Sequence, residues 1–389
     1  YLITVSHMIN DSCQSVLPAL LPLFIYTYGL SLEQAGFLIL ANTALSSLLQ
    51  PLLGYLSDKI NQPRLIALGV LLSACSTGVM GFVTSYESLL VCATLAGVGS
   101  SIFHPEGAKI MNRLGGGKKG KAMGTFAIGG SSGFAIGPLF AGSIAYTVGP
   151  HGLAAFTVVG LIISTILFIL MPRIVAHART IDQAVATENP TLVDKPLKNY
   201  WKYFGILFVI ILSQSVNFRV INAFIPIFWT RELGTSPEQG SFALTIFFSI
   251  GIFMTYIGGL LGDKYGPIKI IRLSLLIWLP AMFLLTEVPA FSPVIMMPVA
   301  YLLLLMIGAA KAISYSPVIV LGQTYLAKSI GFASGITLGV SQTIGGIIAP
   351  VVGNLADTYT LPAAMMTLVP FLVVGLGASL ILKDPKKLQ

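Results

Sequence analysis

The sequence predicts an all-α integral membrane protein in which twelve transmembrane helices form two pseudo-symmetric six-helix bundles. Its composition, its apolar segments and an internal repeat predict this fold class. Of the 389 residues, 55% are hydrophobic and 9% are charged, and the mean hydropathy is +0.87. A soluble domain carries about 25% charged residues. The composition therefore excludes an ordinary soluble protein, a disordered chain and a nucleic-acid binder with a basic surface.

The apolar segments set the number of crossings. One helical crossing of the hydrocarbon core needs about 20 apolar residues. Turn and charged residues divide the sequence into twelve segments of suitable length: 2–28, 34–57, 65–84, 88–111, 121–147, 152–171, 201–230, 241–262, 270–286, 294–321, 330–354 and 361–382. One long polar stretch, 172–200, separates the sixth segment from the seventh. We therefore expect an N-terminal bundle at 1–171, a cytoplasmic linker at 172–200 and a C-terminal bundle at 201–389.

The net charge of +8 is distributed unevenly between the two sides of the predicted bundle. Of the 22 Lys and Arg residues, 19 lie on one side, from Lys59 and Arg64 through the linker to the C-terminal end, whereas the opposite loops carry only Arg231. Because excess Lys and Arg mark cytoplasmic loops, we expect both termini in the cytoplasm. The sequence begins at Tyr1 inside an apolar segment, so we expect a short tail to be missing and no cleavable signal peptide.

The three cysteines, Cys13, Cys75 and Cys92, all lie in apolar segments. An odd number of cysteines in lipid argues against a disulfide framework and against a cysteine-based metal site. We expect no metal and no cofactor.

The two predicted halves resemble each other. Gly54 to Lys59 (GYLSDK) closes the second segment, and Gly259 to Lys264 (GLLGDK) closes the eighth. In the same order and at nearly the same offset, His104-Pro105 matches Ser316-Pro317, and Gly137-Pro138 matches Ala349-Pro350. A parallel repeat of six-helix halves is typical of transporters that rock around a site at the repeat interface.

These residues also carry a family resemblance. Gly54 to Lys59, followed by Arg64, resembles the loop signature of the major facilitator superfamily, and Gly259 to Lys269 resembles its second copy. Gly129 to Gly142 resembles the Gly-Pro motif of that superfamily's antiporters. Ser6 to Asp11, Gln50-Pro51 and Gly99 to Glu106 resemble the fosmidomycin resistance protein family. The resemblance implies proton-driven export of a small anionic phosphonate drug across a bacterial inner membrane.

Polar residues recur on one face of the first and seventh segments. His7, Asn10, Asp11 and Gln14 share a helical face, as do Ser215, Arg219 and Asn222. Because ionisable groups within a membrane are costly, they are candidates for function. We expect Asp11 to exchange protons, and we assign substrate binding to His7, Asn10, Gln14, Arg219 and Asn222. A static Asp11–Arg219 pair is the structural alternative.

Two further segments carry ionisable groups at depth. In the fourth, His104 and Glu106 flank Pro105, which should kink the helix, so both are candidate proton-relay residues and nearby Ser101 is a candidate substrate contact. The alternative is that His104 and Glu106 cap exposed carbonyl groups. In the tenth, Lys311 and Tyr315 are candidate contacts for an anionic head group. A structural pairing of Lys311 with Glu106 or Asp11 is the alternative.

Glycines and turn residues predict helix packing and gating. Gly129, Gly133 and Gly137 are four residues apart, next to Pro138, and should let a neighbouring helix approach closely. The resemblance implies that the two repeated loops latch one half to the other through Gly54, Asp58, Arg64, Gly259 and Asp263. As sequence alone, each Asp-Lys pair also fits a helix cap.

Among function classes, the sequence favours secondary transport. A membrane enzyme using His104 and Glu106 lacks a nucleophile or further ligands, and no nucleotide-binding loop is present. We expect a monomer that handles a small molecule and protons within the bilayer. Export by proton antiport is the first hypothesis, and proton-coupled import of a small organic anion or sugar is the second.

Overall fold

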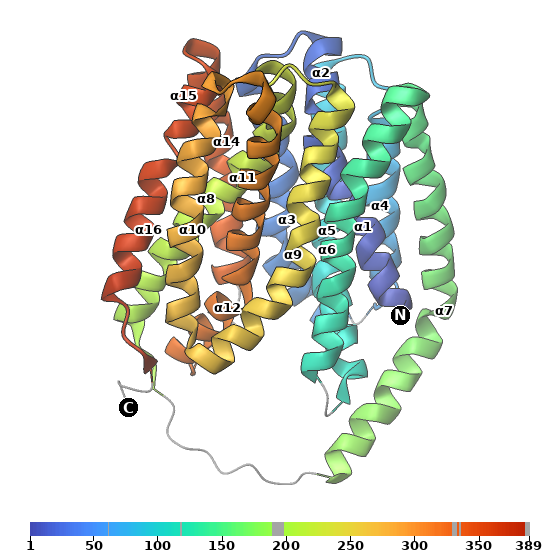
Figure 1. The fold of residues 1–389 in the computed structure, drawn as a ribbon. Coiled ribbons are helices and arrows are strands. Elements are labelled where there is room, and N and C mark those ends of the chain that lie inside the picture. The colour runs from blue at the N-terminus through green and yellow to red at the C-terminus, as the bar shows by residue number, and fades with distance from the viewer. Residues whose placement is uncertain (61, 117–118, 189–197, 329–332, 334–335, 386–389) are drawn as a thin grey trace. The chain divides into compact units, whose positions relative to one another are not determined.

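The computed structural model describes residues 1–389 except 61, 117–118, 189–197, 329–332, 334–335 and 386–389, and nearly all described residues are helical (Figure 1). The first half contains α1 (Leu2–Ala19), α2 (Leu21–Tyr28), α3 (Leu32–Ile60), α4 (Leu65–Val79), α5 (Tyr86–Leu114), α6 (Lys119–Thr147) and α7 (Ala154–Glu188). The second contains α8 (Trp201–Arg231), α9 (Pro237–Tyr265), α10 (Pro267–Glu287), α11 (Pro293–Ile313), α12 (Tyr315–Tyr325), α14 (Ser341–Thr358), α15 (Leu361–Met366) and α16 (Val369–Ile381). Short 3₁₀ turns occupy Pro150–Leu153 and Val288–Ala290, and a π-helix occupies Ile336–Val340.

The all-helical membrane fold predicted from the sequence is confirmed. Within the described residues, nine helices are long and apolar enough to cross a membrane, or up to ten if the bent pair α1–α2 is one span. The predicted segment 65–84 contains the shorter helix α4, whose 15 residues fall below the length of a full span.

Three predicted segments are each broken into two helices, and a proline lies at each break. Segment 361–382 contains α15 and α16, and Pro370 cannot donate to Met366, the last residue of α15. Segment 2–28 contains α1 and α2, which are bent by 48°. Pro22 has no N–H to donate to the carbonyl of Pro18, so the helical ladder is interrupted there. Segment 294–321 contains α11 and α12, and Pro317 likewise cannot donate to Ile313, the last residue of α11.

The sixth helix is longer than its apolar segment. The sequence places the start of a linker at Pro172, but α7 continues through this proline to Glu188 (Figure 1). Pro172 removes only one hydrogen bond of the helix, and the polar residues that follow are compatible with a helix outside the hydrocarbon core. Residues 189–197 of the expected linker lie outside the described residues.

Packing divides the chain into two compact units. Unit 1 comprises Tyr1–Leu17 and Ala41–Pro196, and unit 2 comprises Pro18–Leu40 and Leu197–Gln389. The break after α1 and the first turns of α3 therefore pack with the second half of the sequence. Both units are described separately below.

The start of α3 is held within unit 2 by α14. The carboxylate of Asp357 accepts hydrogen bonds from the backbone N–H groups of Leu32 and Glu33, both at 2.9 Å. These groups have no partner within their own helix, and a negative charge at a helix N-terminus is favourable. Gly36 lies so close to α14 that an added Cβ would come within 2.5–2.6 Å of the Pro350 backbone. Asp357 thus caps α3, although it lies more than 300 positions from Leu32 in the sequence.

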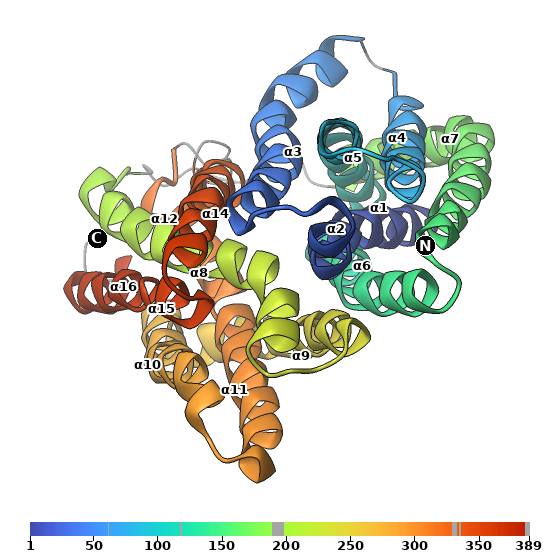
Figure 2. The same ribbon diagram turned by 90° about the horizontal axis from the view of Figure 1, so that it is seen from above.

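The core of unit 1 positions a polar face of α1. Val70, Phe103, Phe126 and Leu167 belong to a buried apolar cluster contributed by α4, α5, α6 and α7. Figure 2 shows α1 beside α5 and α6 in the view from above. The ring of His7 stacks on Phe126 with a centroid distance of 3.9 Å, and its centroid lies 5.5 Å from that of Phe103. The aromatic residues therefore place an imidazole in the interior of the unit.

Candidate functional site

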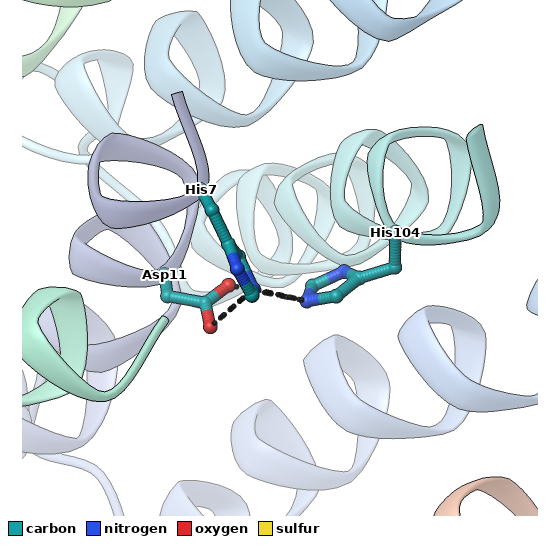
Figure 3. Close-up of side chains that lie close together, drawn as sticks. All are labelled: His7, Asp11 and His104. Carbon is teal, nitrogen blue, oxygen red and sulfur yellow. Dashed lines mark hydrogen bonds and ion pairs between the residues drawn. The ribbon is translucent and has the colours of Figure 1, made fainter. Parts of the chain in front are cut away.

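Three titratable side chains meet in the interior of unit 1. His7 and Asp11 come from α1, and His104 points toward them from α5 (Figure 3). The Nε2 atom of His7 lies 3.2 Å from Oδ2 of Asp11, and the Nε2 atom of His104 lies 3.3 Å from Oδ1. The two Nε2 atoms are 3.3 Å apart. Asp11 is 4% exposed and His7 6% exposed, so the carboxylate is shielded from solvent and compensated by histidines.

The other nitrogen of each imidazole is anchored to the backbone. Nδ1 of His7 lies 2.8 Å from the carbonyl oxygen of Phe126, and Nδ1 of His104 lies 2.9 Å from that of Ser100. A carbonyl only accepts, so both Nδ1 atoms are donors. Each neutral imidazole therefore turns an unprotonated Nε2 toward the same point as the Asp11 carboxylate. Three side chains that converge in this way can share a proton or hold a cation between them.

Polar neighbours from α1 and α5 hold the cluster in place. The amide of Asn10 donates to Oδ1 of Asp11 at 3.0 Å and to the Ser100 hydroxyl at 3.3 Å. Gln14 donates to the carbonyl of Ala96 at 3.0 Å. The amide groups of both residues, predicted to bind substrate, thus make hydrogen bonds within unit 1.

The glycines of α6 bring that helix against the cluster. A Cβ added to Gly130 would lie 2.7 Å from Oδ2 of Asp11 and from the ring of His7. Gly129, Gly133 and Gly137 likewise face backbone atoms of α1, and a Cβ on Gly137 would lie 2.6 Å from the Ser12 carbonyl. Close approach of this kind is available only to glycine. Pro138 continues the same helix.

A second group of charges lies within unit 2. The ammonium of Lys311, on α11, is 4.5 Å from the ring centroid of Phe218 and 4.8 Å from that of Tyr315. The guanidinium carbon of Arg219, on α8, lies 5.6 Å from the same Phe218 ring. Among the described residues of unit 2, no carboxylate lies within 4.0 Å of either cation, and Nε of Arg219 is buried without a hydrogen-bond partner. Phe218 thus has two cations near it, and neither is paired with an acid.

Asn222 lies on the same helix as Arg219, one turn further along. It is 3% exposed, and its Oδ1 has no hydrogen-bond partner among the described residues. Asn222, Arg219 and Lys311 thus contribute unsatisfied or uncompensated polar groups to unit 2. Tyr315 is 38% exposed and lies beside Lys311.

The remaining predicted residues lie apart from these groups. Ser101 is buried and donates to the carbonyl of Val98 in its own helix at 2.7 Å. Glu106 is 4% exposed and is not a member of the His7–Asp11–His104 group. Arg64 lies over the ring of Phe168 at 4.8 Å. Gly259 packs near Ser316, and Asp263 is exposed on α9. Gly54 and Asp58 belong to α3, but their side chains lie outside the described ones.

Three residues of the two groups escaped sequence analysis. Ser100 contacts both Asn10 and His104, Gly130 makes room for the cluster, and the ring of Phe218 lies near both cations. Ser100 lies one helical turn before His104, and Phe218 is adjacent to Arg219, but only the fold shows which neighbour each one contacts. The sequence analysis assigns His7 to substrate binding, whereas the structure places its ring beside Asp11 and His104, the two candidate proton-exchange residues.

Comparison with known proteins identifies the family. The model of the Major Facilitator Superfamily matches residues 3–350 and, in a second match, residues 207–389. The chain belongs to the Major Facilitator Superfamily. An uncharacterised superfamily transporter of Bacillus subtilis, YfnC, is 30% identical over 99% of this chain and 93% of its own length. The fosmidomycin resistance protein of Escherichia coli is 29% identical over 91% of this chain and 85% of its own.

Solved structures agree with the superfamily fold. A bacterial homologue of the human lysosomal transporter Spinster, inward-facing and occupied, has a TM-score of 0.77 and 18% identity, covering 98% of this chain and 95% of the other. A more distant superfamily relative, the hexuronate transporter of Escherichia coli, is 23% identical over 96% of this chain and 90% of its own. YfnC and the hexuronate protein are named as transporters, and with the family match and the long apolar helices they identify this superfamily member as a multi-pass membrane transporter.

Proposed function

We propose that this chain is a proton-coupled secondary transporter of a bacterial inner membrane that exports a small anionic compound such as fosmidomycin. It works by alternating access, as a monomer, with both termini in the cytoplasm. A proton enters as the anion leaves. The fosmidomycin resistance protein is the named relative that favours this substrate class.

The observation that carries the proposal is the uncompensated pair of cations in unit 2. A charged side chain at the centre of a membrane helix costs about 2.5–3.5 kcal/mol on the insertion scale. Arg219 and Lys311 are positioned near one aromatic ring, and no carboxylate of the described part of unit 2 is within 4.0 Å. A bound anion would supply the missing charge. Asn222 and Tyr315, in the same unit, would orient its polar groups. Asn10, Gln14 and Ser101 of unit 1 stay separate candidates for substrate contact.

Asp11 and His104 are the proposed proton carriers, together with His7. Their donor atoms lie within hydrogen-bond distance of one another, so a proton can be shared among the three side chains. When the shared proton leaves, the electron pairs of the three side chains face one another without a positive charge. Binding of the proton should therefore respond to charges that come near the cluster. Glu106, buried on the same helix as His104, would pass protons toward or away from this group.

Export at useful strength is within reach of such coupling. A proton that moves inward through about 100 mV releases roughly 2.3 kcal/mol. Since 1.4 kcal/mol corresponds to a tenfold ratio, the charge of the proton alone sustains a gradient of about fifty-fold in one-for-one exchange, and the outward movement of an anion through the same potential adds to it. This gradient is sufficient to lower the internal concentration of a drug to a small fraction of its external concentration.

The repeated loops are the proposed gates. Gly54, Asp58, Arg64, Gly259 and Asp263 would latch the two halves in one state of the cycle, and the glycines of α6 would let α1 slide along it. The resemblance of both loops to the superfamily signature supports this role.

Import is the second candidate, because a hexuronate transporter is among the relatives. Hexuronate is also a small organic anion, so the cations of unit 2 suit either direction. Direction and substrate therefore need to be tested together.

Everted vesicles with an acidified lumen provide this test. Addition of fosmidomycin outside should collapse the pH gradient, and Asp11→Asn should abolish the response. Retention of the response in Asp11→Asn would refute the assignment of Asp11. If the drug leaves the gradient unchanged in the native protein, export of fosmidomycin is refuted. Uptake of hexuronate into right-side-out vesicles would then support import.

A further inference from the structure

The cluster in unit 1 has the donor set of a transition-metal site. We propose that His7, Asp11 and His104 bind a divalent transition-metal ion, with Zn²⁺ as the best fit, and that the bound ion arrests the transporter. Two histidines and one carboxylate, with a fourth position left open, are a combination found in zinc proteins. The three side chains offer one donor atom each, and these atoms lie within 4.8 Å of one another. In the described part of the chain, no other group of three His, Cys, Asp or Glu side chains has its donor atoms this close together.

The spacing of the two imidazole nitrogens fits a tetrahedral ion. Zinc lies about 2.0–2.1 Å from histidine nitrogen, so two ligands of a tetrahedron are about 3.3–3.4 Å apart. The Nε2 atoms of His7 and His104 are 3.3 Å apart. Each contacts a different oxygen of Asp11, with Oδ2 at 3.2 Å from His7 and Oδ1 at 3.3 Å from His104. The carboxylate therefore faces both nitrogens and can supply the third ligand.

The orientation of both imidazoles supports the same conclusion. Histidine ligands of metals commonly donate their second N–H to a backbone carbonyl, which fixes the tautomer and the ring. Here Nδ1 of His7 donates to Phe126 and Nδ1 of His104 donates to Ser100, so both Nε2 atoms carry free electron pairs. Asn10 donates to Oδ1 of Asp11 and holds the carboxylate in turn. These outer contacts fix both rings and the carboxylate, so the ligands are preorganised.

An ion can reach the site past His104. The side chain of His104 is 25% exposed, whereas those of His7 and Asp11 are 8% and 6% exposed. The fourth position would hold water or a substrate oxygen. Since the ion occupies the point where the proposed function places a proton, a tightly bound metal would stop proton exchange. Inhibition rests on that proposed function, but metal binding does not.

Metal binding is tested directly on the purified full-length protein in detergent, after removal of any histidine tag. Co²⁺ is added as a spectroscopic probe, because tetrahedral Co²⁺ gives an intense visible band whereas octahedral Co²⁺ gives a weak one. We expect the intense band at one equivalent and its loss when Zn²⁺ is added. His7→Asn and His104→Asn should each weaken binding by more than the roughly 10–100-fold that loss of an outer partner costs.

Matched controls are present in the same chain. His151 and His177 are the other two of its four histidines, and both lie outside the cluster. His151→Asn and His177→Asn should bind Co²⁺ as the native protein does. Thermal unfolding without metal checks that each variant is folded. Asp11→Asn preserves the shape of the side chain but removes its negative charge, so it should also weaken Co²⁺ binding.

The outcomes separate this proposal from the proposed function. An absent or octahedral band, or equal binding by the native protein and a folded His7→Asn/His104→Asn double variant, would overturn the metal site. Binding in a protein that moves no fosmidomycin would uphold the metal site and leave the substrate assignment refuted. Zn²⁺ inhibition that persists in folded His104→Asn would show that the ion acts elsewhere, and the proposed arrest at the cluster would be wrong.

Discussion

Neutralising Lys311 distinguishes a binding lysine from a structural one, because the two roles predict stability changes of opposite sign. Lys311 and Arg219 lie near the same Phe218 ring, so their charges are no more than about 10 Å apart. At an effective dielectric constant of about 20, two like charges at that distance repel each other by about 1.7 kcal/mol or more. Burial of the Lys311 charge costs a further 2.5–3.5 kcal/mol or so. Its two cation–π contacts return about 1–2 kcal/mol together. Lys311→Gln should therefore stabilise the substrate-free protein by roughly 2–4 kcal/mol.

The same substitution should weaken anion binding. An anion about 5 Å from the ammonium gains roughly 3 kcal/mol at that dielectric, so its loss should raise Kd on the order of a hundredfold. The assay is thermal unfolding of the purified protein with and without fosmidomycin, followed by calorimetric titration. Lys264→Gln is the matched control, because Lys264 lies 5.2 Å from the Tyr265 ring centroid and is exposed. A Lys311→Gln protein that is less stable yet binds fosmidomycin as well as before would refute the reasoning.

Three further substitutions test other parts of the structure. Gly130→Ala should push on Asp11 and His7, cost about 1–3 kcal/mol in thermal unfolding and abolish the intense Co²⁺ band, whereas Gly124→Ala, where nothing lies within 4 Å, should not. Asp357→Ala removes the cap of α3 and should lower the free energy of unfolding by about 1–2 kcal/mol; unchanged stability would contradict the capping role. Glu106→Gln should slow proton flux in vesicles but leave the Co²⁺ band intact, and loss of the band would place Glu106 in the cluster.

The fold class was predictable from composition and segment length, because the bilayer requires long apolar helices whatever their arrangement. The breaks after α1 and α11 were not recognised, although the prolines were visible. Pro18 and Pro138 also lie inside helices that continue past them, so a proline alone does not mark a break. The association of Pro18–Leu40 with unit 2 depends on contacts such as Asp357 to Leu32, which join residues hundreds of positions apart.

The candidate cluster was predictable only in part, for a similar reason. His7 and Asp11 lie one helical turn apart, so their proximity follows from helix geometry. His104 is 97 positions from His7, and its approach depends on how α5 packs beside α1. Gly130 is one residue outside the glycine pattern that the sequence analysis singled out, yet it is the glycine of α6 that faces the carboxylate. Spacing identified the helix that lies against α1 but not the residue that contacts the site.

The two groups of charges differ in whether their charge can vary, and this difference assigns their roles. In unit 2, Arg219 cannot be deprotonated in ordinary conditions, so its positive charge is fixed and only a bound anion can compensate it. In unit 1, a carboxylate and two imidazoles are groups that can exist with or without the proton. A fixed charge can recognise an anion but cannot carry a proton. A variable charge can carry a proton, and for the same chemical reason it can accept a metal ion instead. The coupling of an anion to a proton therefore needs both groups. A metal ion in the unit 1 cluster would stop proton exchange, whereas the cations of unit 2 would still be able to bind the anion.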